Sequence, residues 1–291
     1  KNTWNFCTSL CKRQEVKLLK VFAVYMVAYR QKNAKSYFRQ TKNINEKIST
    51  FKKIKKNKKN MKIKHGMILA AGLGKRMQPM TLKIPKPLIK IGDKSLLERA
   101  IHLLIDNGIE EISINIHHLA DQIKDFIKQK NYKVKIIFSD ERDSLLGTGG
   151  GILQATKSFN GPFVVINPDT LWNNTYYGEL NNLENLYFKR KKPCLLLVNK
   201  SLSFDNSFKG DFNLHGSTVR RDNSNELIFT GLQIVDQSVF SNIKDNIFSM
   251  NKIWDHLIKD NNLSGIESKQ KFYHLNTKKM YDNISSLNII D

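Results

Sequence analysis

The sequence of 291 residues contains little cysteine, and its cysteines form no pattern. Cys7, Cys11 and Cys194 are an odd number, without the paired spacing of a zinc site or the density of a disulfide scaffold. Both of these classes of small cross-linked domain are therefore excluded. We expect free thiols in a reducing cytoplasm, with Cys194 buried in the apolar run that contains it.

Long apolar runs are also missing. The most apolar stretch, "LLKVFAVYMVAY" (Leu18–Tyr29), has 12 residues and includes Lys20. A membrane-spanning helix needs about 20 predominantly apolar residues. We therefore expect no membrane span in this chain.

Acidic residues are scarce, most of all in the first fifth of the chain. Residues 1–60 hold 17 Lys and Arg against two acids, whereas residues 61–291 hold 31 against 24. The segment "FKKIKKNKKN" (51–60) is a block of like charge, and such blocks are usually disordered; nucleic-acid binding is the alternative. We predict that residues 1–60 are a basic extension outside the main domain, residues 61–291, and that no nucleic acid is bound.

Apolar runs and helical patterns alternate through the rest of the chain. Helical spacing predicts helices over 95–107, 119–130, 150–159 and 248–260, and apolar runs predict strands over 67–71, 110–116, 134–139, 162–167, 194–200 and 226–235. This alternation predicts an α/β protein with a Rossmann-like three-layer α/β/α fold and a mostly parallel central sheet. We expect Trp172, Trp254 and His117 to be structural.

The stretch "MILAAGLGKRMQPMTLKIPKPL" (67–88) carries the clearest local signal. Met67–Ala71 is an unbroken apolar run, typical of a strand buried on both faces of a parallel sheet. Gly72 and Gly74 then predict a turn with free backbone amides. Open α/β sheets bind their ligands at this end of a strand.

Three cations accompany the turn. Lys75 and Arg76 follow the glycines directly, and a guanidinium group offers donors that match phosphate oxygens. Pro85 and Pro87 fix the backbone on either side of Lys86, which is thereby preorganised toward the same crevice. For any one of these features alone, an ordinary solvated loop is the alternative.

As a whole, "LAAGLGKRMQPMTLKIPKPL" (69–88) resembles the N-terminal motif of the sugar-1-phosphate nucleotidyltransferases, L-A-A-G-x-G-x-R-M-x-P-x-T-x-x-x-P-K-P-L, at nearly every fixed position. The resemblance covers the chain from Met61 to its end, so that residues 61–291 would form the nucleotidyltransferase domain. It implies that the glycine turn and Arg76 hold the triphosphate of a nucleoside triphosphate. It also implies that Lys86 contacts the phosphates at the reacting centre.

A second glycine cluster, "SLLGTGGGI" (144–152), surrounds Thr148 with four glycines. A flexible turn before a helix is the structural explanation. The resemblance implies instead a loop whose main-chain groups recognise the nucleobase. The triple glycine is most similar to the N-acetylmuramate-1-phosphate uridylyltransferase branch of the family.

Asp169 follows the apolar run "PFVVIN" (162–167) and is the first candidate metal ligand. A carboxylate at the end of a strand that faces phosphates suits Mg²⁺, although a turn aspartate after Pro168 is the alternative. The resemblance implies a second ligand in "YHLNTKKM" (273–280), where His274 stands at the position of a family aspartate. A neutral imidazole is a poor Mg²⁺ ligand. The alternatives are that His274 contacts a phosphate, or that Mg²⁺ keeps more water molecules in place of a second protein ligand.

The segments "FKGDFNL" (208–214) and "FTGLQI" (229–234) resemble the sugar-facing half of the family. On the sequence alone, the glycines of these two segments indicate only ordinary turns. The predicted site residues, by role, are catalytic Arg76, Lys86 and Asp169; nucleotide-binding Ala70, Ala71, Gly72, Gly74, Lys75, Thr148, Gly149 and Gly150; sugar-phosphate-binding Gly210, Asp211, Thr230 and Gly231; and metal-binding Asp169 and His274.

The resemblance implies Mg²⁺-dependent transfer of a nucleotidyl group to a sugar 1-phosphate, with release of pyrophosphate. The expected substrates are UTP and N-acetylmuramate 1-phosphate, in a cytoplasmic enzyme of peptidoglycan recycling. GTP with mannose 1-phosphate is the alternative pair. A regulatory protein that binds nucleotide sugars without catalysis is the alternative of another class.

Overall fold

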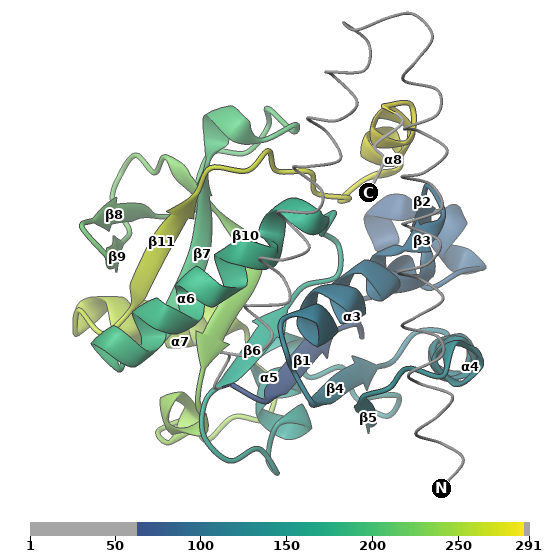
Figure 1. Cartoon of the computed structure of the whole chain (residues 1–291), viewed down its shortest axis with the longest axis horizontal. Helices are drawn as coiled ribbons and strands as arrows, with labels where there is room; N and C mark the ends of the chain where they lie inside the picture. Colours follow the sequence, from purple (N-terminus) through teal and green to yellow (C-terminus); the bar gives the residue numbers. More distant parts are fainter. Residues whose placement is uncertain (1–62, 288–291) are drawn as a thin grey trace, which may run out of the picture. The chain divides into compact units, whose positions relative to one another are not determined.

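A nine-stranded sheet runs through the centre of the computed structural model, which describes residues 63–287 (Figure 1). The predicted extension over residues 1–60, with Cys7, Cys11 and the apolar run Leu18–Tyr29, lies outside the described residues. In spatial order the strands are β5 (Lys135–Asp140), β4 (Glu111–Ile116), β1 (His65–Leu69), β6 (Phe163–Ile166), β10 (Leu227–Val235), β7 (Cys194–Asn199), β11 (Ser264–Ser268), β9 (Thr218–Arg220) and β8 (Asn213–His215).

Most of the long strands are parallel. β5, β4, β1 and β6 pair in parallel, and so do β7 and β11. β10 runs antiparallel to both of its neighbours, β6 and β7, while β8 and β9 form an antiparallel edge. The carboxyl ends of β5, β4, β1 and β6 consequently lie at one edge of the sheet, where such sheets bind ligands.

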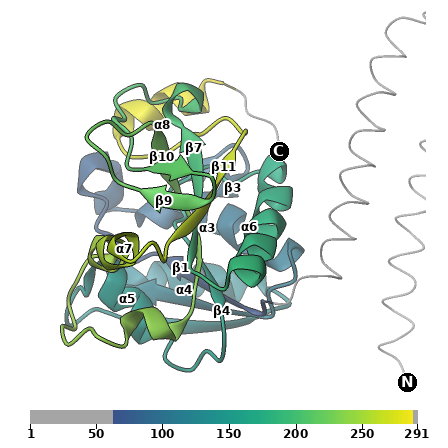
Figure 2. The same ribbon diagram turned by 90° about the vertical axis from the view of Figure 1, so that its left-hand side faces the viewer.

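Helices cover both faces of this sheet and complete the predicted three-layer α/β fold. α3 (Leu96–Asp106), α4 (Ala120–Lys130) and α6 (Tyr177–Arg190) share one apolar core with the sheet, and α5 (Gly147–Ala155) and α7 (Met250–Lys259) share the other. Figure 2 shows α5 and α7 on the side opposite α6. A small third core joins α8 (Lys278–Ser285) to the hairpin of β2 (Lys90–Ile91) and β3 (Lys94–Ser95).

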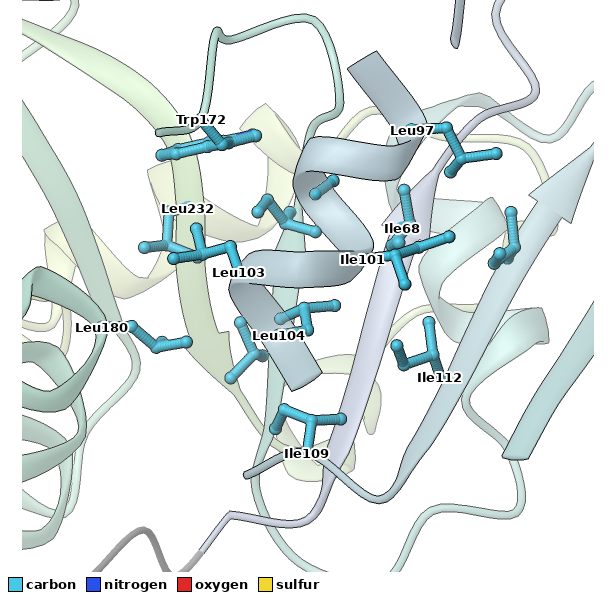
Figure 3. Close-up of a cluster of buried hydrophobic side chains, with 14 of the residues drawn as sticks. Ile68, Leu97, Ile101, Leu103, Leu104, Ile109, Ile112, Trp172, Leu180 and Leu232 are labelled. Atoms are coloured by element: carbon cyan, nitrogen blue, oxygen red, sulfur yellow. The ribbon is translucent and has the colours of Figure 1, made fainter. Parts of the chain in front are cut away.

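The alternation of side chains along β1 explains why both faces are covered. Met67 belongs to the core under α5 and α7, and Ile68 belongs to the core under α3, because successive side chains point to opposite faces. Figure 3 shows Ile68 among side chains of α3, including Ile101. Gly66 lets this helix approach, since a Cβ atom there would lie 3.0 Å from Cδ1 of Leu104.

The predicted elements are largely present, with shifted ends. β1 begins and ends two residues before the predicted strand, and just past its end the amide of Ala70 donates to the Asn115 side chain. The predicted helix over 150–159 is shifted toward the N-terminus, since α5 begins at Gly147 and ends at Ala155. β11, α6 and α8 were not predicted; α6 contains a glycine and three asparagines, and the burial of Leu180 and Leu183 under the sheet stabilises it.

The residues expected to be structural have structural contacts. Trp172 is buried and donates to the backbone oxygen of Asn167, and Trp254 is buried and donates to the side chain of Gln233. Cys194 is a buried free thiol, as expected. Within residues 63–287, every helix is too short or too polar to cross a lipid bilayer.

Leu104→Ala tests the core under α3. Leu104 is fully buried, so we expect the free energy of unfolding to fall by about 2 to 5 kcal/mol, from lost burial and a residual cavity. Urea denaturation measures this change, and Leu82→Ala is the matched control, because Leu82 is 59% exposed. Equal effects of the two substitutions would contradict this description of the core.

Candidate active site

The turn after β1 carries two exposed cations. Gly74 has a φ of 62°, and a Cβ atom there would lie 2.8 Å from Cγ2 of Thr81, so an L side chain is excluded by both strain and space. The hydroxyl of Thr81 also donates to the Gly74 oxygen at 2.9 Å. The next residues, Lys75 and Arg76, are exposed, and neither has an ion-pair partner among residues 63–287. The turn is therefore rigid, and its cations are available to an anion.

A cleft of about 380 Å³ opens above this turn, at the carboxyl ends of β1, β4 and β6. Nine of the predicted site residues line it: Ala70, Ala71, Gly72, Gly74, Lys75, Arg76, Lys86, Thr148 and Asp169. The polar residues Asn115, Glu141, Asn167 and Asn276 line it as well and were not predicted. Asn115 and Asn167 stand at the ends of predicted apolar strands, and this position could have indicated them as site residues.

Lys86 and Asp169 form the charged centre of the cleft. Lys86 Nζ donates to Asp169 Oδ2 at 2.7 Å, and His274 Nε2 lies 3.1 Å from the same oxygen. Burial alone raises the pKa of Asp169, but the nearby charges of Lys86 and His274 outweigh it and hold this pKa well below its ordinary value. Asp169 is therefore an anion at neutral pH.

The free oxygen of Asp169 suits a metal ion. Asp169 Oδ1 is buried and has no hydrogen-bond partner among residues 63–287, because Lys86 and His274 both bind Oδ2. Among the described residues, no group of three or more His, Cys, Asp and Glu is arranged to hold a metal. Mg²⁺ commonly uses one or two carboxylates together with substrate phosphates, so Asp169 alone fits this mode.

His274 is less suited to be the second metal ligand. Its Nε2 faces Asp169, and its ring stacks on Phe272 with the planes 10° apart. Nδ1 is buried and has no partner among residues 63–287. In this arrangement His274 orients Asp169, and metal binding by His274 stays a prediction.

A second pocket, of about 50 Å³, adjoins the cleft and shares Asn167 and Asp169 with it. Its other walls include three of the predicted sugar-phosphate residues, together with aromatic rings: Asp211, Thr230, Gly231, Phe208, Phe272 and His274. Gly231 has a φ of 92° and lies where the pairing of β10 with β7 shifts register, which marks a β-bulge.

Two of the sugar-phosphate candidates have structural partners in the fold. The Thr230 hydroxyl is buried and donates to the oxygen of Leu196. Gly210 lies outside the pocket, and a Cβ atom there would be 2.2 Å from the Asn225 oxygen. The geometry accounts for Gly210 by close backbone packing.

The glycines of α5 are explained by packing on the segment 246–248. The amides of Gly149 and Gly150 both donate to the Phe248 oxygen, and neither residue lines the cleft. A Cβ atom on Gly149 would lie 2.3 Å from the Phe248 ring, and one on Gly150 would lie 2.1 Å from the Asn246 oxygen. Nucleotide contacts by these two glycines stay a prediction, whereas Thr148 lines the cleft.

Comparison with known proteins relates this chain to nucleotidyltransferases. A family model described as nucleotidyl transferase matches residues 65–193. N-acetylmuramate alpha-1-phosphate uridylyltransferase from Neisseria meningitidis is 35% identical over 183 residues, covering 61% of this chain and 78% of that protein. The enzyme of the same name from Caulobacter vibrioides is 29% identical over 221 residues, covering 73% and 91%.

A solved structure shows the same fold. The chain superposes on a putative glucose-1-phosphate thymidylyltransferase from Bacillus anthracis with a TM-score of 0.66 and 19% identity, covering 78% of this chain and 96% of that one. This likeness shows an α/β nucleotidyltransferase fold. The chain belongs to the nucleotidyl transferase family.

Asp169→Asn tests the charge balance of the centre. Without its carboxylate, the partly buried Lys86 loses its counter-charge, so we expect unfolding free energy to fall by about 1 to 3 kcal/mol at pH 7. The pKa of Asp169 is lowered by folding, so its stabilising contribution is complete above about pH 4 and is lost as the pH falls below that value.

Urea denaturation of the wild type and of Asp169→Asn at several pH values checks this. The stability difference should shrink in acid, and a difference that stayed constant would count against the ion pair. Asp245→Asn is the control, because Asp245 and its partner Lys252 are exposed and such pairs contribute little.

Proposed function

We propose that the enzyme transfers the uridylyl group of UTP to N-acetylmuramate 1-phosphate and releases pyrophosphate in a Mg²⁺-dependent reaction. The observation that carries the proposal is the sharing of Asp169 by the two pockets, with Lys86 bound to it. The large cleft has the cationic glycine turn that a triphosphate needs, and the small pocket adjoins it where a second phosphate would arrive.

The chemistry needs positioning and charge stabilisation. An oxygen of the sugar phosphate attacks the α-phosphorus of UTP, a new phosphorus–oxygen bond forms, and the bond to the β-phosphate oxygen breaks with its electron pair leaving on pyrophosphate. The nucleophile is already anionic, so no general base is required. Arg76 and the turn amides hold the triphosphate, and Lys86 stabilises charge at the junction of the two pockets.

Asp169 would hold Mg²⁺ through Oδ1, the oxygen that has no hydrogen-bond partner in the described structure. When bound, Mg²⁺ neutralises negative charge on the phosphates. Lys86 and His274 keep Asp169 ionised and in place through Oδ2. This division of labour assigns a separate role to each oxygen of one carboxylate.

The substrates are proposed from the relatives, since both uridylyltransferases act, by name, on N-acetylmuramate alpha-1-phosphate and are similar over most of their length. A role in peptidoglycan recycling follows from that substrate. We place the enzyme in the cytoplasm, where nucleoside triphosphates are available and a free thiol such as Cys194 stays reduced.

Pyrophosphate release identifies the substrates. Purified protein is assayed with Mg²⁺ while UTP, GTP, dTTP, CTP and ATP are crossed with the 1-phosphates of N-acetylmuramate, mannose and glucose. We expect the highest kcat/KM for UTP with N-acetylmuramate 1-phosphate, and loss of release with a chelator. A maximum for GTP with mannose 1-phosphate would establish the alternative pair, and no release with any pair would refute the proposal.

Lys86→Ala tests the reacting centre. We expect kcat to fall by about a hundredfold or more, because a preorganised charge at the transferred phosphate is lost. Lys90→Ala is the matched control, since Lys90 is exposed and lines neither pocket. Near wild-type turnover of Lys86→Ala, with an unchanged melting temperature, would show that Lys86 has no part in the chemistry.

A further inference from the structure

A buried hydrogen-bonded chain joins the two walls of the large cleft. Asn115 Oδ1 accepts from the amide of Ala70 at 2.7 Å, and Asn115 Nδ2 donates to Glu141 Oε1 at 2.7 Å. Glu141 Oε2 then accepts from the amide of Leu146 at 3.1 Å. We call the two side chains the Asn115–Glu141 tie. It connects the phosphate-binding turn at one end with the start of α5 at the other.

The direction of every bond in the tie is determined. The Ala70 amide can only donate, so the carboxamide of Asn115 must turn its oxygen toward Ala70 and its nitrogen toward Glu141. Asn115 and Glu141 are each 2% exposed. A carboxylate this deeply buried requires its hydrogen bonds, and without them its desolvation would be strongly unfavourable.

The third glycine of the run in α5 makes room for the tie. A Cβ atom on Gly151 would lie 2.7 Å from Glu141 Oε1 and 2.8 Å from Asn115 Nδ2. Gly151 has an ordinary helical backbone, where alanine would otherwise be favoured. The side chains of Asn115 and Glu141 therefore occupy the space that a side chain at position 151 would fill. This steric requirement is an observation separate from the hydrogen bonds.

We propose that Asn115 and Glu141 are positioning residues that set the separation of the phosphate-binding turn from the α5 wall, and thereby the affinity for the nucleoside triphosphate. This inference rests on the proposed function. Both residues line the large cleft, and neither lines the second pocket. Breaking the tie should consequently affect the nucleotide and spare the sugar phosphate.

The test exchanges the two functional groups. In Asn115→Asp with Glu141→Gln, Asp accepts from the Ala70 amide and from the new glutamine nitrogen, and the glutamine oxygen accepts from Leu146. All three bonds are kept and the single charge moves across one bond. Each single substitution breaks the pattern, since Asn115→Asp sets two carboxylates against each other and Glu141→Gln sets two donors against each other.

We expect each single variant to raise KM for the triphosphate by about tenfold or more, with less than about a twofold change in KM for the sugar phosphate. The double variant should recover both the melting temperature and the nucleotide KM. Recovery of the melting temperature without recovery of the nucleotide KM would overturn the proposal, because the Glu141 charge would then act on the substrate directly.

Gly151→Ala gives a second, independent test. We expect it to raise the nucleotide KM as the single variants do, by pushing the two side chains apart. Gly178→Ala is the matched control, because Gly178 also lies in a helix and a Cβ atom there would meet nothing within 4 Å. A wild-type nucleotide KM in Gly151→Ala would contradict the proposal.

A readout without catalysis separates this inference from the proposed function. Amide hydrogen exchange of Ala70 and Leu146 should be slow in the wild type and in the double variant, and fast in both single variants. Binding of the triphosphate, measured by calorimetry in the absence of a sugar phosphate, should follow the same order. Unchanged exchange in the single variants would overturn the tie, whatever reaction the enzyme catalyses.

Discussion

The contact of Lys86 with Asp169 is the interaction on which the active site depends. Lys86 lies between two prolines in the segment that follows β1, and Asp169 follows β6. Their contact therefore joins two segments that are far apart in the sequence. Lys86 and His274 both bind one oxygen of the carboxylate, and the other oxygen has no partner within the described part of the chain. A single side chain therefore serves the large cleft, the small pocket and the charge balance of both.

Much of the fold could be predicted from the sequence, because apolar runs and helical spacing alternate regularly along the chain. Apolar runs predicted the positions of β4, β6 and β7, and helical spacing predicted α3. In the structure, the Ser95 side chain caps α3 by accepting from the amide of Glu98. α6 was missed because its own residues favour helix only weakly and its stability comes from packing. Short edge strands such as β8 carry too few residues for any period to be visible.

The residues of the candidate site could be predicted where glycines and prolines restrict the backbone. Gly74 and Lys86 stand in a segment whose glycines and prolines restrict the chain, and the structure places both in the cleft. Asn115 and Glu141 were missed because each looks like an isolated polar residue until β4 and β5 are paired. Gly149 and Gly150 show a limit of sequence patterns, since glycines that pack against a neighbouring segment look the same in sequence as glycines that contact a ligand.

The bulge in β10 has a consequence for how this site can evolve. Between Phe229 and Gln233 the strand contains two more residues than the facing stretch of β7, and Leu232 and Ile234 belong to the core under α3. Loss of one residue there would turn both leucine and isoleucine to the other face. A change of chain length by one residue is therefore disfavoured at this wall of the small pocket, whereas an exchange of side chains leaves the alternation of the strand intact.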